Sequence, residues 1–207
     1  MYCHNCGKEV YGNFCSNCRA KVLEEGLSKS KIDWTVEKNF DKLIKNPRVR
    51  EIILKYANES LKKISAQEFL ELADTIFESL IGVSTKKVSD LVVPIYQKLG
   101  ISTGKAERKN FNQPIQQVIV KSLCSLAKNG FPVESYEGAS DGLLVTAKIP
   151  SDMWTWGGDI IISIEGNNSS SEINIVVKIK GQLYDWGKSK KLINSFLLDM
   201  QNIELHT

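Results

Sequence analysis

The residues of this sequence best suited to metal chemistry are cysteines near its N-terminus. They form two Cys-x-x-Cys pairs, Cys3 with Cys6 and Cys15 with Cys18. Two residues between paired cysteines make a tight turn that directs both sulfurs to one point, and thiolates at about 2.3 Å complete a closed tetrahedron around zinc. The spacing therefore predicts one structural Zn²⁺ bound by Cys3, Cys6, Cys15 and Cys18.

A closed site of this kind has a structural role. Because protein ligands fill the coordination shell, no position is left for water or a substrate, and catalysis by this metal is excluded. Gly7 follows the second ligand, where a positive φ is expected. Arg19 occupies the equivalent position of the second pair and predicts a more strained turn. Tyr2 and Phe14 precede the two pairs and are expected to supply most of the small core of the unit.

Two segments resemble the short zinc-ribbon modules at the N-termini of many otherwise unrelated bacterial and archaeal proteins. They are Tyr-Cys-x-x-Cys-Gly at 2–7 and Phe-Cys-x-x-Cys at 14–18. The resemblance implies a structural zinc ion. Redox-active cysteine pairs are the alternative, but no strand–helix pattern of the thioredoxin kind surrounds these motifs.

Composition and charge narrow the class of protein. The hydrophobic fraction of 42% and the charged fraction of 25% are typical of a globular chain. A net charge of +3 is well below the positive bias of a dedicated nucleic-acid-binding protein. There is no apolar run long enough to span a membrane and no signal segment, so we expect a cytoplasmic protein without membrane insertion.

The hydrophobic pattern divides the chain into parts. We predict a zinc ribbon at 1–22, a linker at 23–32, a helical bundle at 33–100, a second linker at 101–112 and an α-β-β-β-β-α domain at 113–207. In the bundle, Asp33 is expected to cap a helix with Val36 on its inner face, and Asn46 with Pro47 to start the next. A third helix is expected over 65–80 and a fourth over about 85–99.

The C-terminal part has the pattern of an α+β domain. Strand-like runs lie at 131–137, 142–149, 159–165 and 172–179, and helical patterns at 113–128 and 185–201. This order predicts an antiparallel four-stranded sheet with two helices on one face. The segments Trp156-Gly157-Gly158 and Asp185-Trp186-Gly187-Lys188 resemble uncharacterised bacterial α+β domains, and that resemblance implies no activity.

Other residues suited to chemistry do not form a catalytic set. Cys124 lies beside leucines in a helical pattern and is interpreted as a buried small hydrophobic residue. Residues 100–106 differ from a phosphate-binding loop in their glycine spacing and in Ala106. The histidines His4 and His206 are not placed to serve as a catalytic base, so no catalytic residue is predicted.

Aromatic and basic residues in the C-terminal half form a second candidate site. They lie at element ends beside glycines, and they are Trp154, Trp156, Trp186, Lys188, Lys190 and Lys191. Such a cluster either closes the end of the core or forms a ligand pocket or partner surface.

The sequence thus predicts a non-enzymatic zinc-binding protein that acts by recognition, as an adaptor in protein–protein interaction. One alternative is nucleic-acid binding through the ribbon and the basic turn near Trp186. Another is small-ligand binding by the α+β domain.

Overall fold

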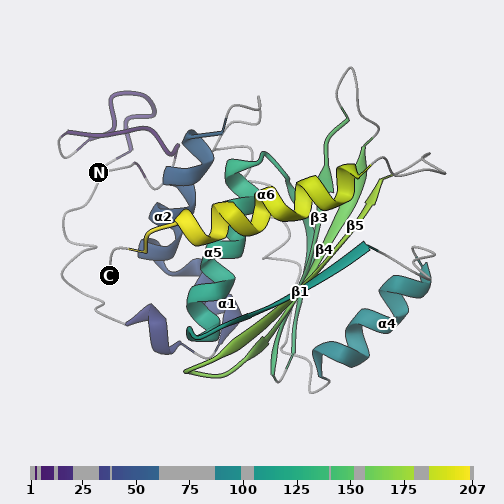
Figure 1. The fold of residues 1–207 in the computed structure, drawn as a ribbon. Helices are drawn as coiled ribbons and strands as arrows, with labels where there is room; N and C mark the ends of the chain where they lie inside the picture. Colours follow the sequence, from purple (N-terminus) through teal and green to yellow (C-terminus); the bar gives the residue numbers. More distant parts are fainter. Residues whose placement is uncertain are drawn as a thin grey trace.

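The computed structural model describes residues 3, 6–11, 14–20, 33–37, 39–60, 87–98, 105–139, 141–151, 157–179 and 187–205. Its centre is a five-stranded antiparallel sheet with the strand order β1-β5-β4-β3-β2 (Figure 1). The strands are β1 (Lys105–Phe111), β2 (Val133–Gly138), β3 (Gly142–Ile149), β4 (Gly158–Gly166) and β5 (Ser171–Ile179). The predicted α+β class and the antiparallel pairing are confirmed, whereas the predicted number of four strands was wrong.

The additional strand, β1, lies within the segment 101–112 that the sequence analysis interpreted as a linker. It pairs with β5 over its whole length and forms one edge of the sheet. The side chain of Arg108 on β1 pairs with Glu172 on β5 at 3.2 Å. An edge strand has one neighbour, and charged side chains protect its free edge from further pairing. The sequence of β1 therefore lacks the apolar pattern that identified the other strands.

The helices connect and cover this sheet. They are η2 (Trp34–Val36, a 3₁₀ turn), α1 (Phe40–Lys45), α2 (Pro47–Asn58), α4 (Val88–Lys98), α5 (Ile115–Lys128) and α6 (Lys188–Asn202). The predicted start of α2 is confirmed, because Asn46 accepts a hydrogen bond from the Arg48 backbone N–H at 2.9 Å and Pro47 occupies the first turn. None of the helices in the described ranges has the length and apolar character needed to cross a bilayer.

The prediction for the first helix was wrong in its extent. Asp33 caps only the short η2, and the extended backbone of Glu37 ends that turn. Asn39 then caps α1 by accepting a hydrogen bond from the Lys42 N–H at 3.1 Å. Val36 is exposed and does not belong to the inner face of a continuous helix. The helix predicted over 65–80 lies outside the described residues.

Helices cover both faces of the sheet (Figure 1). The predicted helices α5 and α6 share one face, where α1 and α2 join them in a single hydrophobic cluster that includes Leu43, Ile53, Ile119, Ile162 and Phe196. On the opposite face, α4 buries a smaller cluster formed by Val88, Leu91, Ala139, Leu144, Ile161 and Val176. The expectation of helices on one face therefore holds for α5 and α6 but omits α4.

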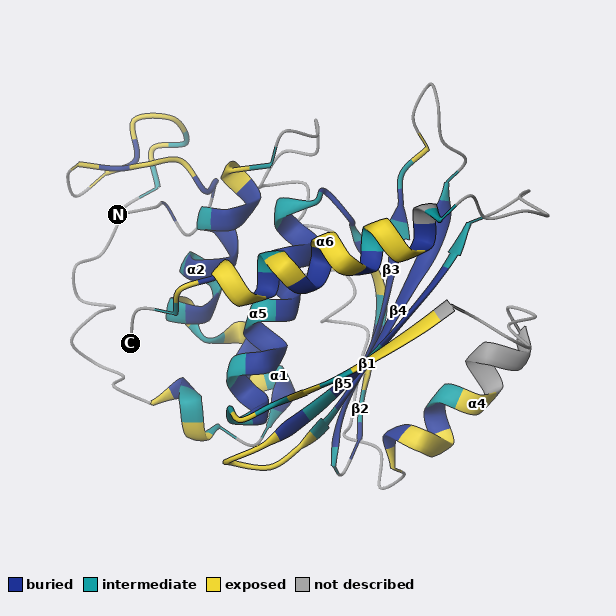
Figure 2. Ribbon diagram, in the orientation of Figure 1, coloured by how far each residue is buried: buried dark blue, intermediate teal, exposed yellow. Residues whose placement is uncertain are grey.

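The described helices of segment 33–100 contact the C-terminal part of the chain. Buried side chains of α1 and α2 pack with those of α5, and α4 packs on β3 and β4. Figure 2 shows buried residues on the helix surfaces that face the sheet and exposed residues on the outer surfaces of α4 and α6. The domain boundaries stay a prediction, because this packing does not define where a separate folding unit begins.

Candidate metal centre

The first cysteine pair is held by a tight hydrogen-bonded turn. The backbone N–H of Gly7 donates to the carbonyl of Cys3 at 2.8 Å, and the N–H of Cys3 donates to the carbonyl of Lys8 at 2.8 Å. Gly7 has φ 69°, a left-handed conformation that glycine adopts without a steric penalty. The sequence-based expectation for Gly7 is confirmed.

The second pair repeats the same turn with a different residue at the left-handed position. Arg19 N–H donates to the Cys15 carbonyl at 2.8 Å, and Cys15 N–H donates to the Ala20 carbonyl at 2.9 Å. Arg19 has φ 58°. A residue with a Cβ atom in this region costs about 1 kcal/mol or more relative to glycine. The predicted strain in the second turn is confirmed.

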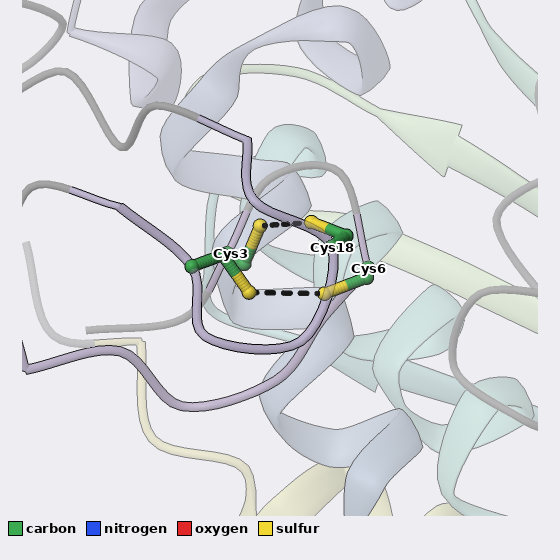
Figure 3. A group of neighbouring side chains, drawn as sticks. Cys3, Cys6 and Cys18 are labelled. Carbon is green, nitrogen blue, oxygen red and sulfur yellow. Dashed lines mark hydrogen bonds between the residues drawn. The ribbon is translucent and has the colours of Figure 1, made fainter.

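The sulfur atoms of the two turns converge on one point. All lie within 4.8 Å of one another. Cys3 Sγ is 3.5 Å from Cys18 Sγ, and Cys6 Sγ is 3.4 Å from Cys15 Sγ (Figure 3). Thiolates placed tetrahedrally at about 2.3 Å from an ion are separated by about 3.8 Å. Two of the observed separations lie slightly below this value, all are within 4.8 Å, and none of these cysteines forms a disulfide, so the site fits a metal ion.

The backbone of the second turn also favours the thiolate form of its first ligand. Hydrogen bonding from the backbone of Cys18 lowers the pKa of Cys15; burial opposes this shift, and the backbone of Asn17 adds to it. The thiolate is the form of cysteine that binds metal. In contrast, burial raises the pKa of the Cys124 thiol on α5, which is fully buried as predicted. The lowered pKa of Cys15 suits a metal ligand, whereas the raised pKa of Cys124 suits a residue that packs in the core.

We refer to residues 3–20 as the cysteine module. Its core is smaller than predicted, because Val10 and the cysteines are its buried apolar residues in the described part. Phe14 is 62% exposed, so the prediction that it supplies the core was wrong. Tyr11 is 90% exposed. Tyr2, the other predicted core residue, lies outside the described residues. Convergence of the cysteines replaces a hydrophobic core and leaves both described aromatic rings at the surface.

The cysteine module is in contact with the helical part of the protein. The side-chain amide of Asn58, the last residue of α2, donates a hydrogen bond to the Gly7 carbonyl at 2.6 Å. This carbonyl belongs to the turn that carries the first cysteine pair. The contact was not predicted from the sequence, because a single asparagine at a helix end has many roles, most often in capping. The predicted linker 23–32 lies outside the described residues.

The structure does not test the second candidate site. Trp154, Trp156 and Trp186 lie outside the described residues, as does the side chain of Lys188 at the first position of α6. Lys190 and Lys191 are exposed in the first turn of α6. The role of this cluster therefore stays a prediction.

A cavity lies where α5 begins. Its volume is about 400 Å³, and it is lined by Phe40, Ile115, Gln116, Asp141, Gly166, Asn167 and Asn168. Asp141 is the charged residue of this lining, and its carboxylate accepts a hydrogen bond from the Val88 N–H at 3.0 Å. The lining combines a carboxylate and amides with one aromatic ring. It was not predicted, because these residues come from separate turns and from two helices.

Comparisons of the chain with protein-family models, with curated proteins and with solved structures found no match. The resemblance of residues 2–18 to zinc ribbons is therefore supported by cysteine spacing and by sulfur geometry. Any function has to be inferred from the described residues themselves.

Proposed function

We propose that this chain is a non-enzymatic zinc-binding protein that acts by recognition of a protein partner, and that the cysteine module is its recognition element. The ion is Zn²⁺, which favours a closed tetrahedral shell of thiolates. The observation that carries the proposal is the exposure of Phe14 and Tyr11, at 62% and 90%, on a module whose backbone a metal holds in place.

Exposed aromatic rings on such a small unit favour a binding role. Aromatic residues carry much of the energy of protein interfaces, since they bury a large area and lose few rotatable bonds. A metal-held backbone also reduces the conformational entropy that is lost on binding. Phe14 and Tyr11 are therefore suited to enter an apolar groove on a partner protein.

The contact with α2 supports an adaptor role. The hydrogen bond from Asn58 to the Gly7 carbonyl joins the cysteine module to the helix that packs on α5. The module is thus presented from a folded body, and its aromatic rings occupy a defined position relative to that body.

Affinity capture with matched variants tests this function. The full zinc-loaded chain is compared with the double variant Tyr11→Ala, Phe14→Ala and with the control Leu198→Ala. The control shortens an apolar side chain of α6 that is likewise exposed, at 58%. We expect proteins bound by the wild type and the control to be lost from the double variant, at an unchanged zinc content. Identical bound proteins from all three chains would refute the cysteine module as the recognition element.

Small-ligand binding is a second candidate function, favoured by the cavity at the start of α5. A ligand with hydrogen-bond donors suits the acceptor groups of its lining. Asp141→Asn removes the charge and keeps an oxygen that accepts from Val88 N–H. If a panel of small amines raises the melting temperature of the wild type, this variant should lose the effect. A panel without any effect would refute this candidate.

A further inference from the structure

Arg19 occupies a position at which the fold itself favours glycine. Among the described residues it is the non-glycine residue with a positive φ, and the equivalent position of the first turn is Gly7. A glycine at position 19 would form the same turn without steric strain. Arg19 is exposed, and it forms no ion pair with a described residue. Neither packing nor pairing in this part of the chain explains the arginine.

The turn places the backbone of Arg19 close to that of the exposed Phe14. Its backbone N–H donates to the Cys15 carbonyl at 2.8 Å, and Phe14 directly precedes Cys15. The side chains of Phe14 and Arg19 therefore leave neighbouring positions of one metal-held turn. Arginine and tyrosine are among the residue types that dominate interface hot spots. An exposed arginine beside an exposed phenylalanine, on a module that also exposes Tyr11, has the composition of a binding surface.

We infer that Arg19 determines specificity and that the partner segment is acidic, with a carboxylate next to an apolar or aromatic side chain. This inference rests on the proposed function. The planar guanidinium binds a carboxylate through two parallel hydrogen bonds, while Phe14 and Tyr11 contact the apolar side chain. Lys8, which is exposed on the first turn, adds a second positive charge.

The charge of the module favours an acidic peptide over a nucleic acid. In its described part the exposed charged residues are Lys8, Glu9 and Arg19, which leaves one net positive charge. Binding to a nucleic acid depends on several phosphate contacts made by basic residues. One arginine fork and two aromatic rings are instead sufficient to recognise a short peptide motif.

Selection from a phage-displayed library of random peptides on the full zinc-loaded chain tests the inference. We expect the selected peptides to be enriched in Asp or Glu next to an apolar or aromatic residue. Binding of one selected peptide is then measured by fluorescence anisotropy. Arg19→Gly should weaken it at least about tenfold, as expected for loss of a charge-assisted hydrogen-bond pair. The same variant should keep or strengthen zinc retention against a chromogenic chelator, because it relieves strain.

Two further variants make the measurement specific. Arg19→Lys keeps the charge but lacks the planar fork, so it should restore only part of the affinity. Lys8→Ala removes the other exposed cation of the module and should have a smaller effect than Arg19→Gly. A variant that loses zinc along with peptide binding would show that Arg19 has a structural role, and this would overturn the inference.

The outcomes separate this inference from the proposed function. If Phe14→Ala abolishes peptide binding and Arg19→Gly does not, or if the selected peptides are neutral, the inference is wrong and the proposed function stands. If no peptide is selected, or if Tyr11→Ala and Phe14→Ala leave binding unchanged, the proposed function is wrong as well. Tighter, steeply salt-dependent binding of an oligothymidylate would favour the nucleic-acid alternative and overturn both.

Discussion

The cysteine module and the five-stranded sheet are held together by different forces. In the module, the buried apolar residues of the described part are Val10 and cysteines. In the sheet, β4 alone contributes Ile160, Ile161, Ile162 and Ile164, all fully buried. A metal ion bound by the cysteines would hold the module together and leave its aromatic side chains at the surface, whereas the sheet is held together by burial of its apolar side chains. Exposure of an aromatic ring is thus informative about function mainly in the module.

Removal of the metal should affect only one of the two regions. Structural zinc contributes on the order of 10–16 kcal/mol to small zinc-binding units, and the sheet has its own core. We expect chelation, or Cys15→Ser, to abolish protection from amide exchange in residues 6–11 and 14–20 while β4 stays protected. Hydrogen-exchange mass spectrometry measures both regions at once. Loss of protection in β4 would show that the sheet depends on the metal.

A substitution that creates a cavity in the sheet core tests whether destabilising the sheet leaves the metal site intact. Ile162→Ala removes a fully buried side chain and should lower the free energy of unfolding by about 2–5 kcal/mol. Leu198→Ala, at a 58% exposed position, should change it by less than about 0.5 kcal/mol. Denaturant titration measures both values, and zinc content should stay at one equivalent per chain in each variant. A change in zinc content would indicate that the two regions fold as one cooperative unit.

A buried carboxylate at one end of the sheet makes a pH-dependent contribution to the stability of the fold. Lys148 Nζ donates to Asp159 at 2.6 Å and lies 2.9 Å from Glu134. Asp159 is 2% exposed. The hydrogen bond to Asp159, followed by that to Glu134, raises the pKa of Lys148 above its ordinary value of 10.5. A raised pKa in the folded state means that this stabilisation is complete below pH 10.5 and is lost as the pH rises through the folded-state value.

Lys148→Met should therefore destabilise the protein and flatten its alkaline profile. The variant leaves the Asp159 carboxylate without its cation, which costs about 1–3 kcal/mol for a buried group. The difference in unfolding free energy between wild type and variant should be constant near neutral pH and shrink above pH 10.5. Urea titrations across this range measure it. A difference that does not shrink would show that Lys148 acts through packing.

The two turns of the module offer a reciprocal pair of substitutions. Gly7→Ala places a Cβ atom at φ 69° and should weaken zinc retention, with a cost of about 1 kcal/mol. Arg19→Gly removes the strain at φ 58° and should improve it by a similar amount. Competition with a chromogenic chelator measures both. Effects of the same sign would show that the two turns are not equivalent.

The sequence predicted those features that follow from local spacing or from a continuous apolar pattern. The convergence of the cysteines follows from two short turns. The strand β3 was predicted over its observed range, 142–149, because apolar residues recur along this segment. The edge strand β1, which pairs with β5, could not be identified, because pairing on one side requires no apolar alternation. Val36 was predicted to lie on the inner face of a helix because its spacing fits the helical period. The extended backbone of Glu37 instead ends the short turn directly after Val36.

Phe14 shows most clearly why the candidate site was only partly predictable. An aromatic residue next to a metal ligand is expected to pack on the ligand turn, and the same sequence is compatible with a ring in solvent. The outcome depends on the three-dimensional path of the module, in which Val10 is buried and Phe14 is exposed. Val176 is a similar case. It alternates along β5 with the residues of the main hydrophobic cluster, but α4 buries it on the opposite face of the sheet.

The contact between the two regions should produce the smallest effect. Asn58→Ala removes the donor to the Gly7 carbonyl and should cost the module about 1 kcal/mol, the typical contribution of one hydrogen bond. Alanine also favours the helix that Asn58 ends, so global stability should stay level or rise slightly. Asn202→Ala is the matched control, since Asn202 is exposed and is likewise the last residue of its helix, α6.

Hydrogen exchange distinguishes these two consequences of Asn58→Ala. Faster exchange in residues 6–11, together with unchanged exchange in α2, would show that the amide holds the cysteine module against the helix. The control should change neither region. If exchange in residues 6–11 is the same in both variants, the four-sulfur site positions the module without help from α2, and the separation between the two regions is complete.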